Sequence, residues 1–325
     1  MILNTYHKPV LLDEAISYLI SDTHGIYVDG TLGGGGHSAR ILDHLASDGR
    51  LYAMDQDEDA LEYAAGRFKK DDRISLIRGN FGFFDVLLPK KIHGNIRGIL
   101  LDLGVSSHQI DEPERGFSFQ ADGPLDMRMG SLQTTTAAGI VNEYEYARLR
   151  DLFFEYGEER QSARIARAVL ESRPLKTTAH LREAIASVVP DRFLNKSLAR
   201  IFQALRIEVN DELKMLKRVL EKGHALLGDR GRMVVITYHS LEDRLCKNFF
   251  RYGNFEGRPE KDFYGNTLRP MKMLHKKIIS VSTDEAAANP RSRSAKLRAA
   301  EKLPAGKEGR QSETGPTKPN KRGRS

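Results

Sequence analysis

Four consecutive glycines between a strand-like and a helix-like segment place the strongest constraint on how this chain folds. Residues 26–29 are apolar up to Asp29, the glycines are Gly33–Gly36, and helix-forming residues follow. Glycine lets the backbone adopt positive φ and approach a ligand closely, and the start of a helix has N–H groups without intrahelical partners. The pattern predicts a strand–turn–helix unit of an α/β fold, with a small-molecule site at the carboxyl end of the strand.

Further strands and helices extend this prediction to a doubly wound, Rossmann-like parallel sheet of seven strands. The expected strands are residues 25–29, 50–55, 74–78, 98–103, 231–238 and, near the end, 276–281 and 295–301. Three helical stretches at 143–172, 178–188 and 196–222 have no strands between them. We therefore expect a discontinuous catalytic domain (1–111 and 209–300), a helical substrate-recognition insertion (112–208) and a disordered basic tail (301–325).

Composition and charge indicate a globular protein with a basic end. The 325 residues are 40% hydrophobic and include one cysteine, no stretch is apolar enough to span a bilayer, and the first residues do not resemble a signal peptide. These features predict a cytoplasmic protein without disulfides or membrane association. Residues 291–325 carry a net charge of +8, whereas the whole chain carries +7, so the rest of the chain is close to neutral. Such an end is attracted to polyanions such as RNA, although a merely solvated tail has the same composition.

Polar side chains follow each of the first four predicted strands. Asp29, Asp55, Asn80 and Asp102 stand at these four ends, and Phe81 follows Asn80. Carboxylates suit the hydroxyls of a ribose and a cationic amino-acid portion, whereas an amide and an aromatic ring suit an adenine, so the set favours an adenosyl amino acid. A nicotinamide dinucleotide is the alternative, because residues 34–39 also fit the loose form of its glycine fingerprint.

The longer motifs resemble the RsmH or MraW family of 16S ribosomal RNA cytosine-N4 methyltransferases. The matching segments, which occur in order along most of the chain, are 7–14 (HKPVLLDE), 29–38 (DGTLGGGGHS), 101–109 (LDLGVSSHQ), 115–119 (RGFSF), 122–129 (DGPLDMRM), 238–244 (YHSLEDR) and 289–294 (NPRSRS). Tyr238 stands where the family often has Phe, and His108 where it often has Pro. The resemblance does not cover the chain beyond about Lys302.

This resemblance implies a class I methyltransferase fold and S-adenosylmethionine as methyl donor. We expect no metal, because no second cysteine accompanies Cys246. The resemblance makes Gly35, Gly36 and His37 contacts to the methyl donor, Asp55 the ribose acceptor and Phe81 an adenine-side contact. It also places Asp102 and Gln109 nearer the reacting end. The implied substrate is a cytidine of the decoding region of 16S rRNA, in the small ribosomal subunit or an assembly intermediate of it. The oligomeric state stays open, with a homodimer as one option.

Methylation of cytosine N4 needs an acceptor beside the amino group, because the nitrogen lone pair is delocalised into the ring. Asp102 is the leading candidate. The sequence after it, Leu103-Gly104-Val105, lacks the Pro-Pro-aromatic motif common among methyltransferases that modify exocyclic amines. The aromatic ring that holds the base must therefore come from elsewhere, and the candidates are Phe117, Phe119 and Tyr238, each of which suits core packing as well.

Two further groups of residues are candidates for the substrate side. His239 and Asp243 could orient the base or move a proton, although a histidine at a strand-to-helix junction often serves as a helix cap. Arg291 and Arg293 could hold RNA phosphates, as could an arginine face formed by Arg160, Arg164 and Arg167. The other functions considered are methylation of a different amine, a non-catalytic role in ribosome assembly and a nicotinamide oxidoreductase.

Overall fold

A computed structural model of the chain describes residues 9–131, 133–261, 263, 265 and 269–304. Within this part, eight strands form one sheet in the order β3-β2-β1-β4-β5-β8-β6, with β7 paired to β8. The strands are β1 (Ile26–Asp29), β2 (Arg50–Asp55), β3 (Ile74–Arg78), β4 (Ile96–Asp102), β5 (Leu227–Thr237), β6 (Met271–Met273), β7 (Ile279–Ser280) and β8 (Lys296–Lys302).

Strands β1 to β5 pair in parallel, whereas β6, β7 and β8 add antiparallel pairings at one edge. The carboxyl ends of all five parallel strands therefore lie at the same edge of the sheet. The order of the parallel strands reverses between β1 and β4, and this is the point at which open α/β sheets bind ligands.

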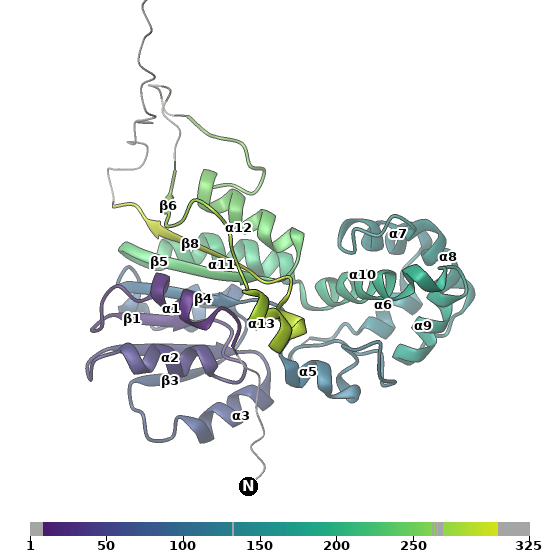
Figure 1. The fold of residues 1–325 in the computed structure, drawn as a ribbon, viewed down its shortest axis with the longest axis horizontal. Helices are drawn as coiled ribbons and strands as arrows, with labels where there is room; N and C mark the ends of the chain where they lie inside the picture. The colour runs from purple at the N-terminus through teal and green to yellow at the C-terminus, as the bar shows by residue number, and fades with distance from the viewer. Residues whose placement is uncertain (1–8, 132, 262, 264, 266–268, 305–325) are drawn as a thin grey trace, which may run out of the picture.

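Helices cover both faces of the sheet (Figure 1). Buried side chains of α1 (Leu12–Leu19), α2 (Gly36–His44) and α3 (Glu58–Arg67) pack with one face. Those of α4 (Phe84–Leu87), α11 (Glu212–Leu226) and α12 (Ser240–Tyr252) pack with the other. Short helices α5 (Ser107–Asp111) and α13 (Thr283–Ala288) lie near the carboxyl edge.

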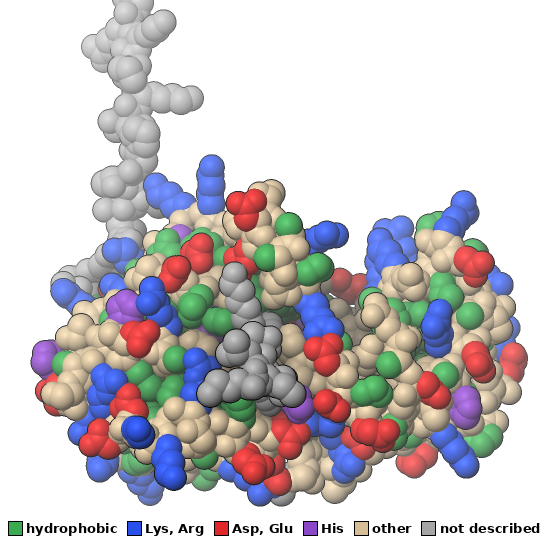
Figure 2. All heavy atoms as spheres, turned by 60° about the horizontal axis from the view of Figure 1, so that its bottom comes forward, with side chains coloured by type: hydrophobic (Ala, Val, Ile, Leu, Met, Phe, Trp, Pro, Cys, Tyr) green, Lys and Arg blue, Asp and Glu red, His purple; other side chains and the backbone are tan. Residues whose placement is uncertain are grey.

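Five helices form a separate lobe beside the sheet (Figure 1). They are α6 (Ala137–Glu143), α7 (Tyr146–Glu155), α8 (Ser162–Glu171), α9 (Thr178–Ala186) and α10 (Asp191–Asn210). We call residues 125–210 the helical lobe. It has its own hydrophobic core, in which Phe153, Ile165 and Leu205 are fully buried. On the face drawn in Figure 2, a notch separates this lobe from the sheet.

The structure confirms the predicted α/β architecture and corrects several details. The sheet has an eighth strand, β6, whose three residues are too short to give a period-two pattern. The predicted helix 143–172 is divided into α7 and α8 near Glu158, which has φ 50°. Arg160 lies in that break, so it does not share a helix face with Arg164 and Arg167.

Two other boundaries also differ from the sequence prediction. The predicted helix 196–222 is divided at Asp211, where φ is 53° and α10 gives way to α11. Strand β8 continues through Lys302, two residues into the predicted tail, and residues 305–325 of that tail lie outside the described residues. None of the helices in the described part of the chain is both long enough and apolar enough to cross a membrane.

Candidate active site

A pocket lies along the carboxyl edge of the parallel strands. One end is formed by the turns after β1, β2 and β3, and the other by residues after β5 together with the start of α11. Asp102, at the end of β4, lies in the lining between these two ends. The lining residues that the sequence singled out are Gly36, His37, Asp55, Asn80, Phe81, Asp102, Gln109 and Tyr238.

The glycine loop, residues 30–36, forms one wall through backbone conformations that favour glycine. Gly33 has φ 47°, and its N–H donates to Asp55 Oδ2 at 2.8 Å. Gly35 has φ 69° at the N-cap of α2, and it shapes the turn without lining the pocket. A Cβ at Gly36 would lie 2.9 Å from the ring of Pro9. The loop therefore cannot accept larger residues at Gly35 or Gly36 without moving.

Asp29 holds the glycine loop in place and does not line the pocket. The residue is fully buried, and its carboxylate accepts hydrogen bonds from the Thr31 amide at 3.1 Å and the Ser38 hydroxyl at 2.7 Å. Burial raises the pKa of Asp29. Of the four polar residues at the predicted strand ends, Asp29 is thus the one outside the pocket lining, because its buried carboxylate is engaged within the loop.

Asp55 and Phe81 line the pocket at the ends of β2 and β3. Asp55 also accepts the Asp57 amide at 3.0 Å through Oδ1, and burial raises its pKa to about 6. Gln109 lines the pocket as well, but its side-chain oxygen accepts the Ser106 amide at 3.1 Å and its nitrogen donates to Asp57 at 2.7 Å. Its amide therefore fixes the start of α5 as well as the pocket wall.

Two hydrogen bonds hold Asp102 at the middle of the pocket, and the His37 ring lies beside its carboxylate. Its amide donates to Thr31 Oγ1 at 2.6 Å, its Oδ1 accepts the Tyr238 hydroxyl at 2.9 Å, and its Oδ2 lies 3.6 Å from His37 Nδ1. Burial, and then the charge of Asp102, raises the pKa of Tyr238 well above its usual range. The Tyr238 hydroxyl thus stays protonated and orients the carboxylate.

His37 stands beside Asp102 as a neutral ring. Burial lowers its pKa, and its Nε2 lies 3.1 Å from the carbonyl oxygen of Val10. Because a carbonyl can only accept, Nε2 carries the proton and Nδ1 has a lone pair. His37 Nδ1 and Asp102 Oδ2 are therefore two neighbouring acceptors, which is a suitable place for a ligand that donates hydrogen bonds.

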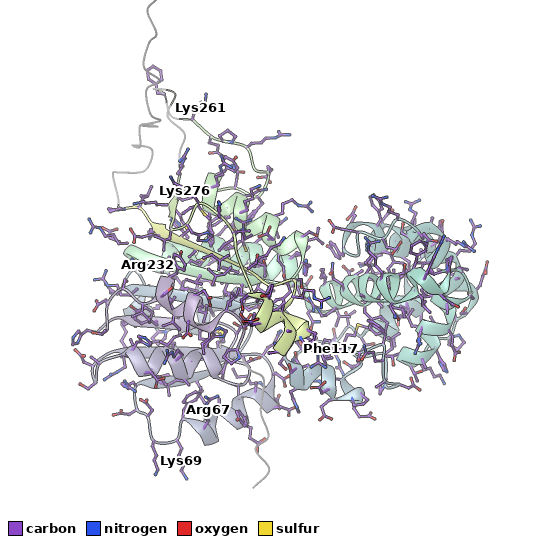
Figure 3. The ribbon with its side chains drawn as sticks, in the orientation of Figure 1. Arg67, Lys69, Phe117, Arg232, Lys261 and Lys276 are labelled. Atoms are coloured by element: carbon purple, nitrogen blue, oxygen red, sulfur yellow. The ribbon has the colours of Figure 1, made fainter. Side chains whose placement is uncertain are left out.

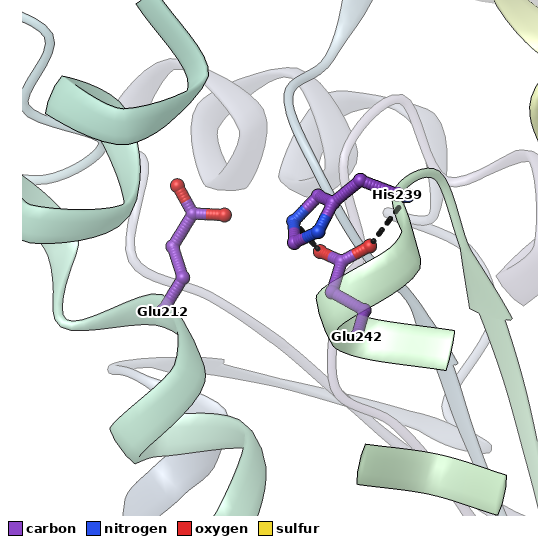
Figure 4. Close-up of side chains that lie close together, drawn as sticks. All are labelled: Glu212, His239 and Glu242. Carbon is purple, nitrogen blue, oxygen red and sulfur yellow. Dashed lines mark hydrogen bonds and ion pairs between the residues drawn. The ribbon is translucent and has the colours of Figure 1, made fainter. Parts of the chain in front are cut away.

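The far end of the pocket is lined by Glu212, Tyr238 and Glu242, and the predicted site residue His239 stands beside them without lining the pocket. We call these four residues the α11–α12 corner, and Figure 4 shows Glu212, His239 and Glu242. Glu242 is buried, and its Oε2 accepts the amides of Tyr238 at 2.8 Å and His239 at 3.3 Å. Its Oε1 lies 3.2 Å from His239 Nε2. Burial alone would raise the pKa of Glu242, but the charges of His239 and Arg206 and its hydrogen bonds hold it below the usual value.

The His239 ring lies between two carboxylates without a well-aligned hydrogen bond. Its side chain is 7% exposed, and neither ring nitrogen has a partner at hydrogen-bond geometry. Its edge is directed toward Glu212, which is held at both oxygens by Arg206 at 2.8 and 3.0 Å (Figure 4). One potential ligand atom from each of Glu212, His239 and Glu242 lies within 4.8 Å of the others, so the corner can accept hydrogen bonds from an amino group or hold a cation.

Sequence reasoning missed both carboxylates of this corner. Glu242 lies inside a motif that had been noted for its histidine and Asp243, whereas nothing in the sequence marks Glu212. His239 is the N-cap residue of α12, as its position suggested. Asp243 points into an ion pair with Arg298 at 2.7 Å, so its carboxylate is already engaged. The prediction that the protein binds no metal stays a prediction.

Several predicted substrate-binding residues lie away from the pocket. Phe117, which Figure 3 labels, and Phe119 pack against the core of the helical lobe. The centroids of the Phe119 and Phe202 rings are 5.4 Å apart. Packing of the Phe117 and Phe119 rings against hydrophobic side chains explains why they lie away from the pocket. Of the three candidate aromatic residues, only Tyr238 lines the pocket. Arg291 forms an ion pair with Asp111 at 2.6 Å, and Arg293 is exposed outside the lining.

Comparison with known proteins gives consistent matches over almost the whole chain. The model of the MraW methylase family matches residues 4–303. A protein from Flavobacterium johnsoniae is 49% identical over 303 residues, which cover 92% of this chain and 98% of the relative. One from Phocaeicola vulgatus is 46% identical over 300 residues, covering 91% and 97%. Both relatives are named ribosomal RNA small subunit methyltransferase H.

Proposed function

The chain belongs to the MraW methylase family, and from this premise we propose that it methylates the N4 amino group of a cytidine in 16S rRNA, with S-adenosylmethionine as donor. The substrate is the decoding region of the small subunit or of its assembly intermediate, and the reaction takes place in the cytoplasm. The observation that carries the proposal is the position of Asp102, between the glycine loop and the α11–α12 corner.

The residues around the glycine loop fit an adenosyl amino acid. Asp55 is placed for the ribose hydroxyls, and Asn80 and Phe81 for the adenine. The paired acceptors His37 Nδ1 and Asp102 Oδ2, 3.6 Å apart, suit the α-ammonium group. When bound there, S-adenosylmethionine supplies an activated methyl group on a sulfonium.

Asp102 is the proposed acceptor for the amino group. The Tyr238 hydroxyl occupies Oδ1 from one side, which fixes the carboxylate plane. A fixed carboxylate that accepts one N–H of the amine orients its lone pair and takes the proton that the nitrogen must lose. His37 does not compete for this proton, because burial lowers its pKa.

The α11–α12 corner is the proposed seat of the base. Tyr238 offers an aromatic ring at the pocket wall, on which a cytosine can stack. Glu242 is buried and ionised, and Glu212 and His239 face the same space. The two carboxylates suit the amino edge of cytosine, and the helical lobe, joined directly to Glu212 through α10, is the proposed substrate-recognition element.

The product identifies the function. The protein is incubated with unmethylated small ribosomal subunits and S-adenosylmethionine, the RNA is digested, and nucleosides are identified by mass spectrometry. We expect N4-methylcytidine. A methyl group found only on another amine would replace the proposed substrate, and absence of turnover despite a melting temperature raised by S-adenosylmethionine would favour an assembly role. A melting temperature raised by NAD instead would favour the oxidoreductase.

A further inference from the structure

A groove between α11 and α12 opens beside the pocket, and cationic side chains dominate its charge. Its lining includes five cations, Lys214, Lys217, Arg218, Lys222 and Arg244, and one carboxylate, Glu221. The groove shares the lining residue Met215 with the pocket, and Glu242 of the pocket follows Leu241 of the groove. A long ligand lying in the groove would therefore have a neighbouring segment at the α11–α12 corner.

The spacing of four of these cations keeps them on one face of α11. Lys217 and Arg218 follow Lys214 by three and four residues, and Lys222 follows Arg218 by four, which places all of them on one side of the helix. The opposite face carries Leu216 and Leu220, which are buried in the sheet core. Because the buried face anchors the helix, the stripe is presented to solvent along a rigid element.

The five cations of the groove differ in their ion pairs. Arg218 donates to both oxygens of Asp85 at 3.0 and 3.1 Å, and Lys222 lies 4.0 Å from the same carboxylate. Among the described residues, no carboxylate oxygen forms an ion pair within 4.0 Å with Lys214, Lys217 or Arg244. The groove thus has uncompensated positive charge, in contrast to Arg291, which is paired with Asp111.

An aromatic ring lies within this positive surface. Phe255 lines the groove and is partly exposed, and the Lys217 ammonium is 5.7 Å from its ring centroid. The ring also stacks on Phe249, with centroids 5.5 Å apart, so its position is fixed. A positive groove with a fixed aromatic platform is the arrangement that single-stranded nucleic acids require.

We propose that this groove binds the ribose-phosphate backbone of single-stranded RNA next to the target cytidine. The inference rests on the proposed function for the identity of the polyanion and deepens it, because it assigns the path by which the RNA reaches the pocket. Phosphates contact Lys214, Lys217 and Arg244, and Phe255 stacks with a flanking base. An acidic protein segment is the other polyanion that such charge would attract, but it would make no use of the ring.

The test is the salt dependence of RNA binding. A fluorescein-labelled oligocytidine of about 12 nucleotides is titrated with the full chain between roughly 50 and 200 mM KCl. Three lost phosphate contacts should reduce the slope of log K against log salt by about 2 in the Lys214/Lys217/Arg244→Ala variant. The matched control, Lys69/Lys70/Lys91→Ala, removes the same charge from exposed sites on the sheet side, where Figure 3 marks Lys69.

A groove variant with the same slope as the control would overturn the proposal. Both variants should keep the rise in melting temperature caused by S-adenosylmethionine, which shows that they are folded. On ribosomal subunits, the groove variant should raise KM about tenfold or more and leave kcat within about twofold, because the lost contacts are to phosphates away from the reacting atoms.

The two proposals fail in different ways. If the wild-type chain forms no N4-methylcytidine but the groove variant still loses its salt slope, the groove stands and the substrate assignment falls. If N4-methylcytidine forms and the groove variant matches the control in slope and KM, the function stands and the groove is overturned. Phe255→Leu adds a second readout, since it should weaken oligocytidine binding about fivefold or more with an unchanged salt slope.

Discussion

The glycine loop and the α11–α12 corner face each other across one pocket, yet they are held by different kinds of interaction. At the glycine loop, carboxylates accept backbone N–H groups from the turns, as Asp55 does from Gly33. At the corner, Glu242 likewise accepts backbone amides, but Glu212 is paired with a half-buried cation of another helix, Arg206. The glycine-loop wall therefore depends on local backbone geometry, whereas the corner also depends on an ion pair between helices.

The largest effect should follow from breaking that ion pair. Glu212→Gln removes the carboxylate that pairs with the Arg206 guanidinium through two hydrogen bonds, where the two side chains are 15% and 11% exposed. We expect the free energy of unfolding to fall by about 3 kcal/mol, because a partly desolvated cation loses its partner. Urea unfolding measures this change.

A double variant separates the charge effect from packing. Arg206→Met with Glu212→Leu removes both charges, and it should be at least about 1 kcal/mol more stable than Glu212→Gln alone. If Glu212→Gln costs less than about 0.5 kcal/mol, the corner does not depend on this ion pair. S-adenosylmethionine should still raise the melting temperature of either variant, because the glycine loop is unchanged.

An intermediate effect is expected at Tyr238, which belongs to the corner but contacts Asp102. Tyr238→Ala removes the stacking ring and should lower kcat/KM by roughly 10- to 100-fold, corresponding to about 1–3 kcal/mol of base stacking. Tyr238→Phe keeps the ring and should lower it less than about tenfold. The measurement is steady-state methylation of small subunits.

Phe119→Leu is the matched control, because Phe119 packs against the core of the helical lobe and does not line the pocket. Its kcat/KM should stay near that of the wild type. If Tyr238→Phe loses as much activity as Tyr238→Ala, kcat/KM depends on the hydrogen bond from the Tyr238 hydroxyl to Asp102 and not on the ring.

The smallest effect is a pH dependence on the glycine-loop side. The pKa of Asp55 is raised to about 6 by burial, so in the folded state its carboxyl is largely protonated below this pH. In the proposed binding mode the ionised form accepts the ribose hydroxyls, so the Kd of S-adenosylmethionine should rise as the pH falls through 6, by up to about tenfold at pH 5.

The same shift affects stability with a defined sign. Because the folded-state pKa is above the unfolded value, Asp55 contributes stability that is full below about pH 4 and is lost as the pH rises through 6. Asp55→Asn should make both the Kd of S-adenosylmethionine and the stability less dependent on pH. Calorimetric binding titrations from about pH 5 to 7.5 follow the Kd, and a Kd that does not change with pH in the wild type would contradict this role of Asp55.

The parts of this protein that sequence could predict are those built from neighbouring residues. Strands β2 and β3 match their predicted bounds, and Asp55, Asn80 and Asp102 line one pocket as expected from parallel strands. Such positions follow from hydrophobic periodicity and from the shared edge of a parallel sheet. The family resemblance is confirmed by matches over most of the chain.

The parts that sequence did not predict depend on tertiary packing. Glu212 lies close to His239 and Glu242 because Asp211 adopts a left-handed conformation that divides one predicted helix into two. Phe117 and Phe119 stand next to the pocket motifs in sequence, but hydrophobic burial draws them into the helical lobe. Asp29 belongs to the predicted site by its position in the sequence. In the structure its carboxylate accepts hydrogen bonds from the Thr31 amide and the Ser38 hydroxyl within the loop.

The central claim is that Asp102 joins the two walls as the acceptor of the amino group. A single turnover of subunit methylation by protein saturated with S-adenosylmethionine, followed as N4-methylcytidine, tests it most directly when wild type and Asp102→Asn are compared. The account predicts a rate about 10²- to 10⁴-fold lower in the variant, with the Kd of S-adenosylmethionine changed less than about tenfold. A variant rate within about threefold of wild type, with the same product, would contradict it.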